Sequence, residues 1–174
     1  MSEDHNGRLS GAGDGSLRAR AMALVNPASG LANDFLNVYN EILMMIELLP
    51  VAPELVDEID AWRPSSYRAY FMQSPLPGAP DAIVAYDAID SAFRALFEAS
   101  VERLAESSVA AIESVSAAIA AGAGDHSEQI VLVCTCAAAR MRAQLHATEQ
   151  LINNGSLASD ADPQAIANKL ISAA

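Results

Sequence analysis

The sequence predicts an all-α protein, and three observations favour this class. Apolar residues make up 52% of the 174, and the excess is mainly alanine rather than aromatic residues, which is typical of closely packed helices. Long segments repeat apolar residues at spacings of three and four. Six of the eight prolines fall outside these segments, between residues 50 and 81. We therefore expect a helical bundle of three long amphipathic helices, with a short C-terminal helix and a proline-rich connection.

The first 20 residues differ from the rest of the chain. They are rich in Gly, Ser, Asp and Arg and hold almost no large apolar side chain. Such a composition cannot offset the entropy lost on ordering, so residues 1–20 are predicted to be a disordered arm. A chain of this length makes one folded domain, which we expect over residues 21–174.

The first long helix is predicted over residues 31–49, because apolar residues recur through this segment until Pro50 ends it. Asn33, Asn37 and Asn40 share one face of this helix, opposite its apolar side. Asparagine is a poor helix former, so three of them suggest a polar surface that docks against another chain or against the connection. The alternative is an ordinary solvated face. Leu36 and Leu43 lie beside the apolar stripe and call for the terminal helix or a second subunit to cover them.

Residues 50–81 are predicted to be a structured connection with short helices near 53–61 and 66–72. The stretch WRPSSYRAYF at 62–71 holds four of the nine aromatic residues and two of the nine arginines. These residue types are enriched at protein-binding hot spots. The same side chains could instead plug the open end of the bundle.

Two long helices follow. A short lead helix is predicted at 81–88, and then Asp90 caps a helix whose apolar stripe continues to residue 119, where glycines at 122 and 124 end it. Ser127 is a plausible cap for the next helix, at about 128–153. The short glycine turn between them predicts an antiparallel hairpin. Asp162 and Pro163 then open a short amphipathic helix, whose apolar residues are Ile166, Leu170 and Ile171.

The net charge of −12 belongs to the region after residue 25, because the first 25 residues balance three Arg against three acidic residues. A domain with Lys169 as its one lysine lacks the basic surface that nucleic-acid binding requires. No segment approaches 18 uninterrupted apolar residues, and the N-terminus lacks the apolar stretch of a signal peptide. We expect no nucleic-acid partner, no transmembrane segment and a cytoplasmic location.

The sequence contains none of the common catalytic motifs. His146 and Glu149 share a helix face, which is typical of a solvated ion pair when no second histidine-bearing helix completes a metal site. Cys134 lies on an apolar stripe and Cys136 lies off it, as expected of unpaired cysteines. The acidic row of Glu98, Glu102 and Glu106, with Arg94 one turn earlier, is typical of a solvated face. We therefore expect no metal or other cofactor.

The leading functional hypothesis is a non-enzymatic adaptor or regulatory subunit that binds another protein. Its expected binding surface combines the asparagine face with the aromatic connection: Asn33, Asn37, Asn40, Trp62, Arg63, Tyr67, Arg68 and Tyr70. A homodimer is a further possible assembly. The alternative is a bundle that binds an apolar ligand or coats an apolar surface such as a storage granule. A third hypothesis is an enzyme that works through Tyr39, Glu41 and His146.

Overall fold

The computed structural model describes residues 24–122 and 128–155, and it confirms the all-α class. Most of the described residues are helical, and the strands are two residues long. The predicted arm over 1–20, the predicted cap at Ser127 and the C-terminal helix predicted from Asp162 lie outside the described residues. The α-helices of the described part are α2 (Asn37–Leu48), α3 (Val56–Ala61), α4 (Tyr67–Gln73), α5 (Ala79–Ala88), α6 (Ser91–Ala120) and α7 (Glu128–Asn154).

The described chain begins with a small hairpin rather than with a helix. Strands β1 (Val25–Asn26) and β2 (Leu31–Ala32) pair antiparallel, and Gly30 closes the turn at a φ of 74° that suits glycine. The prediction of a helix from residue 31 was therefore wrong at its start, because Leu31 and Ala32 are extended to pair with β1. A 3-10 turn over Asn33–Leu36 then leads into α2.

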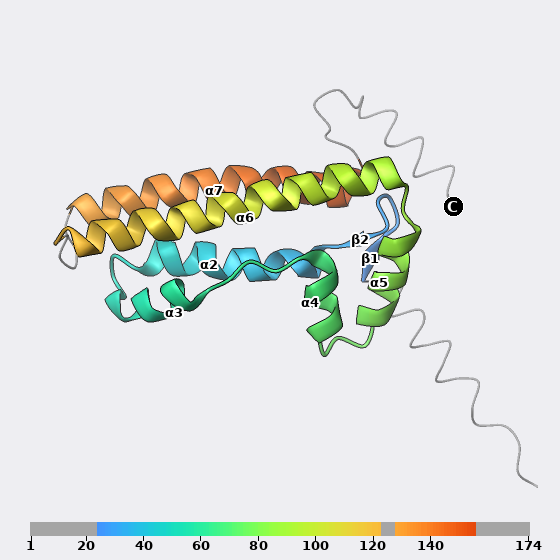
Figure 1. Ribbon diagram of the computed structural model, residues 1–174, viewed down its shortest axis with the longest axis horizontal. Helices are drawn as coiled ribbons and strands as arrows, with labels where there is room; N and C mark the ends of the chain where they lie inside the picture. Colours follow the sequence, from blue (N-terminus) through green and yellow to red (C-terminus); the bar gives the residue numbers. More distant parts are fainter. Residues whose placement is uncertain (1–23, 123–127, 156–174) are drawn as a thin grey trace, which may run out of the picture.

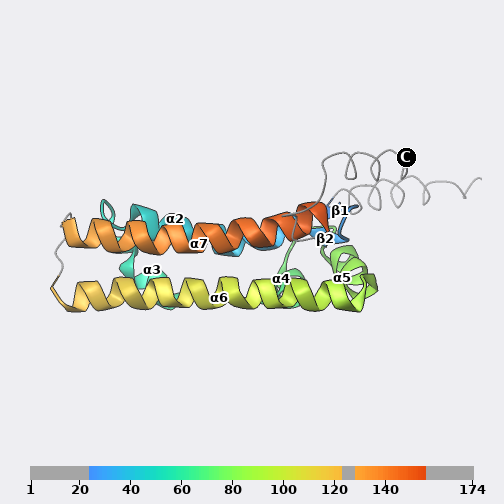
Figure 2. The same cartoon turned by 90° about the horizontal axis from the view of Figure 1, so that it is seen from above.

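The two long helices lie side by side along the long axis of the molecule and run in opposite directions (Figures 1 and 2). Asp90 caps α6 as expected, since its carboxylate accepts hydrogen bonds from the backbone N–H groups of Ala92 and Phe93 at 2.9 and 3.0 Å. Gly122 follows the end of α6 with a φ of 88°, the conformation that commonly ends a helix.

The core lies where α2 packs against both α6 and α7. Small side chains such as Ala111 of α6 and Ala137 of α7 are buried there and let the helices approach closely. Leu36 and Leu43 are also buried, at 4% and 7% exposure. Because neighbouring elements of the described chain already cover these two leucines, they give no reason to expect a second subunit.

Helices α3 and α4 lie on the other side of α2 from α7, and α5 lies beside α4 and the β-hairpin at one end of the molecule (Figure 1). Helix α3 packs on α6, and the Ser116 hydroxyl donates a hydrogen bond to the Asp60 carboxylate at 2.7 Å. Residues 62–66 connect α3 to α4 without helical structure. This connection runs beside α6, and its position determines the shape of the candidate site.

Candidate functional site

A cluster of aromatic rings holds α4 and α5 against α2 and α6. Phe35 is at its centre, with ring centroids 5.6 Å from Tyr39, 5.4 Å from Tyr67 and 6.2 Å from Phe97. Tyr67 also stacks on Tyr86 of α5, with centroids 4.8 Å apart and an interplanar angle of 25°. Aromatic pairs in such geometries are each worth about 0.5–1.5 kcal/mol beyond their burial. The ring cluster therefore forms a rigid base for the groove that is described below.

The connection 62–66 is fixed to α2 by two hydrogen bonds. The indole N–H of Trp62 donates to the Val38 carbonyl at 3.1 Å, and the hydroxyl of Tyr39 donates to the Ser65 carbonyl at the same distance. Trp62 is 9% exposed, and its ring packs edge-on against Tyr39. The connection therefore cannot move toward α6 without breaking these contacts.

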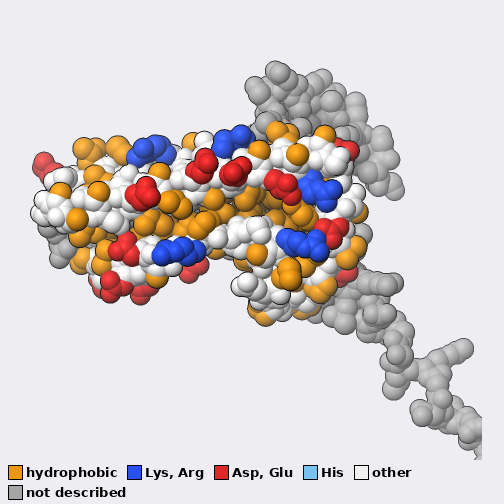
Figure 3. Space-filling model, in the orientation of Figure 1, with side chains coloured by type: hydrophobic (Ala, Val, Ile, Leu, Met, Phe, Trp, Pro, Cys, Tyr) orange, Lys and Arg blue, Asp and Glu red, His pale blue; other side chains and the backbone are white. Residues whose placement is uncertain are grey.

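A groove lies between this connection and α6. Its volume is about 750 Å³ and its lining is mainly apolar. In the space-filling view, hydrophobic side chains form a band between the α6 surface and the elements below it (Figure 3). The lining residues are Tyr39, Pro64, Ser65, Ser66, Tyr67, Arg68, Tyr86, Ala95, Phe97, Glu98, Ala99, Val101, Glu102 and Ala105.

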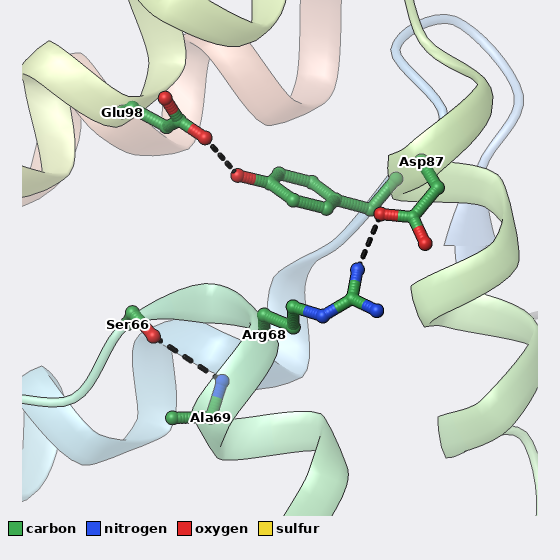
Figure 4. A network of polar contacts seen from close by, with 6 residues as sticks. Ser66, Arg68, Ala69, Asp87 and Glu98 are labelled. Carbon is green, nitrogen blue, oxygen red and sulfur yellow. Dashed lines mark hydrogen bonds and ion pairs between the residues drawn. The ribbon is translucent and has the colours of Figure 1, made fainter.

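Polar contacts hold the end of the groove together (Figure 4). Arg68 of α4 forms an ion pair with Asp87 of α5, with Nη1 and Oδ1 2.5 Å apart. The Tyr86 hydroxyl donates a hydrogen bond to the carboxylate of Glu98 on α6. The guanidinium of Arg94 lies 5.9 Å from the centroid of the Tyr86 ring, within the range of a cation–π contact. These contacts join α4 to α5 and α5 to α6.

The tyrosines of the groove stay protonated at neutral pH. Burial raises the pKa of Tyr39 and of Tyr67 to about 12, and the hydrogen bonds that these hydroxyls make lower it by less. The pKa of Tyr86 is also raised, first by burial and then by its hydrogen bond to the Glu98 carboxylate. Each hydroxyl therefore serves as a fixed, uncharged hydrogen-bonding group.

The asparagine face proves to make contacts within the fold. Asn33 donates to the side-chain oxygen of Asn153 on α7 at 2.8 Å, and the Asn37 side chain lies near Tyr70 of α4, where it opposes part of the rise that burial causes in the pKa of Tyr70. The hydrogen bond of Asn33 gives a structural reason for an asparagine in the 3-10 turn that leads into α2. Asn40 is exposed. None of the three lines the groove.

The aromatic segment 62–71 contributes only some of its residues to the groove. Tyr67 and Arg68 line the groove, whereas Trp62, Arg63 and Tyr70 do not. Tyr67 is buried, and its hydroxyl accepts a hydrogen bond from the Ala32 N–H at 2.9 Å. The burial of Trp62 and Tyr67 favours the plug interpretation for these two rings. Arg63 is exposed and donates to the carbonyl groups of residues 60 and 62, both at 2.7 Å.

Sequence reasoning missed the α6 side of the groove. Phe97 and Val101 were assigned to the core stripe of a long helix, and Glu98 and Glu102 to its solvated face. All four line the groove, because the groove follows the boundary between the two faces. The i, i+4 spacing of each pair was visible in the sequence. The position of the connection opposite them was not.

Two other candidate sites from the sequence are the pair His146 and Glu149 and the two cysteines. His146 and Glu149 lie 3.7 Å apart on the exposed face of α7 and border a shallow hollow of about 380 Å³. Over residues 24–122 and 128–155, no group of three or more His, Cys, Asp or Glu side chains is placed to hold a metal ion. Cys134 is buried and Cys136 is exposed, both as free thiols.

None of the helices in the described ranges is both long enough and apolar enough to cross a lipid bilayer. Comparison of the chain with models of protein families, with curated proteins and with solved structures gave no match.

Proposed function

We propose that this protein is a non-enzymatic adaptor or regulatory subunit whose groove binds a segment of another protein. The observation that carries the proposal is the groove itself: a mainly apolar surface of about 750 Å³ along α6, open to solvent and bounded by charged side chains. Exposed apolar surface bordered by polar residues is typical of interaction sites, because contact with water makes it costly to leave uncovered.

The shape of the groove favours a polypeptide partner. Its α6 wall extends from Ala95 to Ala105, eleven residues that span about 15 Å of helix. A chain segment of about three helical turns would cover that length. Its apolar side chains would lie on the partly exposed Val101, above the buried rings of Phe97 and Tyr67, and its backbone would lie beside the small residues Ala99 and Ala105.

The walls of the groove are already in place, which lowers the cost of binding. Tyr39 and Trp62 fix the connection on one side, and Tyr86 fixes α5 to α6 at the end. A preorganised surface loses less conformational entropy when a partner binds. We infer that α2, α6 and α7 act as the bundle expected from the sequence, an antiparallel hairpin with a third helix against it, and that this bundle is the rigid support.

The proposal moves the binding surface away from the asparagine face. Asn33 joins the 3-10 turn before α2 to α7, and Asn37 lies near Tyr70 of α4, so both make contacts within the fold and neither lines the groove. The aromatic segment 62–71 keeps its proposed role through Tyr67 and Arg68 of α4. A small apolar ligand is the second candidate, because the groove volume lies within the range of about 300–1,000 Å³ found for ligand pockets.

A pair of photo-cross-linking residues would test the proposal in the source cells. One replaces Ala105, which lines the groove, and its control replaces Ala110, which is exposed on the same helix outside the groove. We expect one protein to be cross-linked from position 105 only, and Ala95→Trp to abolish this product by filling the groove. Equal products from both positions would overturn the proposal. Native mass spectra with a bound small molecule that Ala95→Trp displaces would favour the ligand instead.

A further inference from the structure

We propose, resting on the proposed function, that the segment bound in the groove is an amphipathic helix with lysine or arginine along the flank that faces α6. The inference comes from three features of the groove: the charge of its two rims, the backbone of the connection and the spacing of the carboxylates.

The α6 rim of the groove is acidic. Glu98 and Glu102 line it, and Glu106 continues the row one turn further along the helix. On the opposite rim the charge of Arg68 is balanced by its ion pair with Asp87. Arg94 lies at the end of the groove over the Tyr86 ring rather than along the acidic row. The groove therefore presents a negative rim that complements a cationic flank.

Tyr86 gives Glu98 a defined position. Its hydroxyl donates to Oε1 of that carboxylate, so the side chain has lost rotational freedom before any partner arrives. Binding of a cation to Glu98 therefore costs less side-chain entropy than binding to a freely rotating surface carboxylate. Within the acidic row, Glu98 is therefore the carboxylate that Tyr86 holds in place.

The connection favours a helical partner over an extended one. A strand could add to residues 62–66 only through their backbone N–H and carbonyl groups. Pro64 has no N–H, and the Ser65 carbonyl already accepts the Tyr39 hydroxyl. The other wall is α6, whose backbone groups bond within the helix. Side chains must therefore supply the contacts, as they do when a helix lies in an apolar groove.

The spacing of the carboxylates sets the pattern of the partner. Glu98, Glu102 and Glu106 are four residues apart, which places them about 6 Å apart along the helix axis. A helix lying along α6 would match them with basic residues three or four positions apart. Its apolar residues would recur at i, i+3 or i+4, and i+7, and face Val101 and Ala105, the partly exposed apolar residues of the α6 wall.

The experiment selects peptides from a displayed library of random 18-residue sequences, using the full chain as the target. We expect the enriched peptides to combine this apolar spacing with a net positive charge. Glu102→Lys should weaken their binding about tenfold, and acidic replacements in the peptide should restore it. Glu113→Lys is the matched control, since Glu113 is exposed on α6 outside the groove, and it should have little effect.

Neutral or acidic enriched peptides, or equal effects of Glu102→Lys and Glu113→Lys, would overturn the inference about charge. The proposed function would survive that result if Ala95→Trp still abolished binding. Ala95 is exposed, so this substitution leaves the core intact, and a thermal unfolding curve verifies folding. Peptides that bind Ala95→Trp at full strength would place the site elsewhere, as would a library that yields no binder, and either result would overturn the proposed function itself.

Discussion

Trp62 holds the α3–α4 connection against α2 in two ways. Its ring is almost fully buried against Tyr39, and its indole N–H bonds to the Val38 carbonyl. A tryptophan suits this position because one side chain supplies both apolar packing and a directional hydrogen bond, and it is the single tryptophan of the sequence. Trp62 does not line the groove, but it holds in place the connection that forms one of the groove's walls.

We predict that Trp62→Ala lowers the free energy of unfolding by about 3–5 kcal/mol, because it leaves a cavity and removes the indole hydrogen bond. Equilibrium unfolding in urea, followed by circular dichroism, measures the loss. Arg63→Ala is the control on the neighbouring residue, which is exposed, and should change stability by less than about 0.5 kcal/mol. Equal stability of the two variants would contradict the plug interpretation.

The buried tyrosines predict a loss of stability at high pH. The pKa of Tyr39 and Tyr67 is about 12 in the folded protein against an ordinary value of 10.0. Below pH 10 both states keep their phenol protons, so stability does not change. Between pH 10 and 12 the unfolded chain loses these protons first, and the free energy of unfolding falls as the pH rises.

Phenolate absorbance and helicity, followed together during an alkaline titration, measure this effect. We expect most phenolate to form only above pH 11, together with loss of helix. The same titration in concentrated urea should centre near pH 10 and serves as the unfolded reference. Complete phenolate formation near pH 10 with full helicity would show that the tyrosines are exposed.

At the scale of elements, the sequence was most informative where the periodicity was long. The segments now seen as α6 and α7 were predicted within a few residues, because their stripes repeat over many turns and Asp90 caps α6. The start of α2 was not, since pairing of Leu31 and Ala32 with a strand depends on the turn at Gly30 rather than on periodicity. The small polar residues of the core, Ser100 and Thr148, also escaped prediction.

Ser100 of α6 and Thr148 of α7 form a buried hydrogen bond between the long helices, with hydroxyl oxygens 2.9 Å apart. Thr148 also donates to the Gln144 carbonyl, so Ser100 must donate to Thr148. We predict that Thr148→Val costs about 1–3 kcal/mol by leaving the Ser100 hydroxyl unpaired. Adding Ser100→Ala should recover part of this loss. A double-mutant cycle of unfolding energies measures the coupling, and strict additivity would show that the bond contributes nothing.

At the scale of the whole molecule, the candidate site could be predicted only in part. The sequence indicated Tyr67 and Arg68 because aromatic and arginine residues cluster there. It could not indicate Val101 or Glu102, since both belong to an ordinary amphipathic helix until a second element lies opposite. The groove depends on the distance that Trp62 and Tyr39 set between the connection and α6. Contacts of this kind join residues more than 20 positions apart, and local spacing does not encode them.

The last prediction concerns where the stable fold begins. Deleting residues 2–20 removes almost no large apolar side chain, so we expect the melting temperature to change by less than about 5 °C. Deleting residues 2–26 is the matched comparison and should lower it further. The longer deletion removes β1, whose Val25 pairs with Ala32, and the Asn26 side chain, which bonds to Asn153 of α7 and to the Ala28 N–H. Differential scanning calorimetry of both variants measures the two changes. A large drop with the shorter deletion would show that the N-terminal residues contribute to the core, and equal melting temperatures for both would show that the hairpin does not.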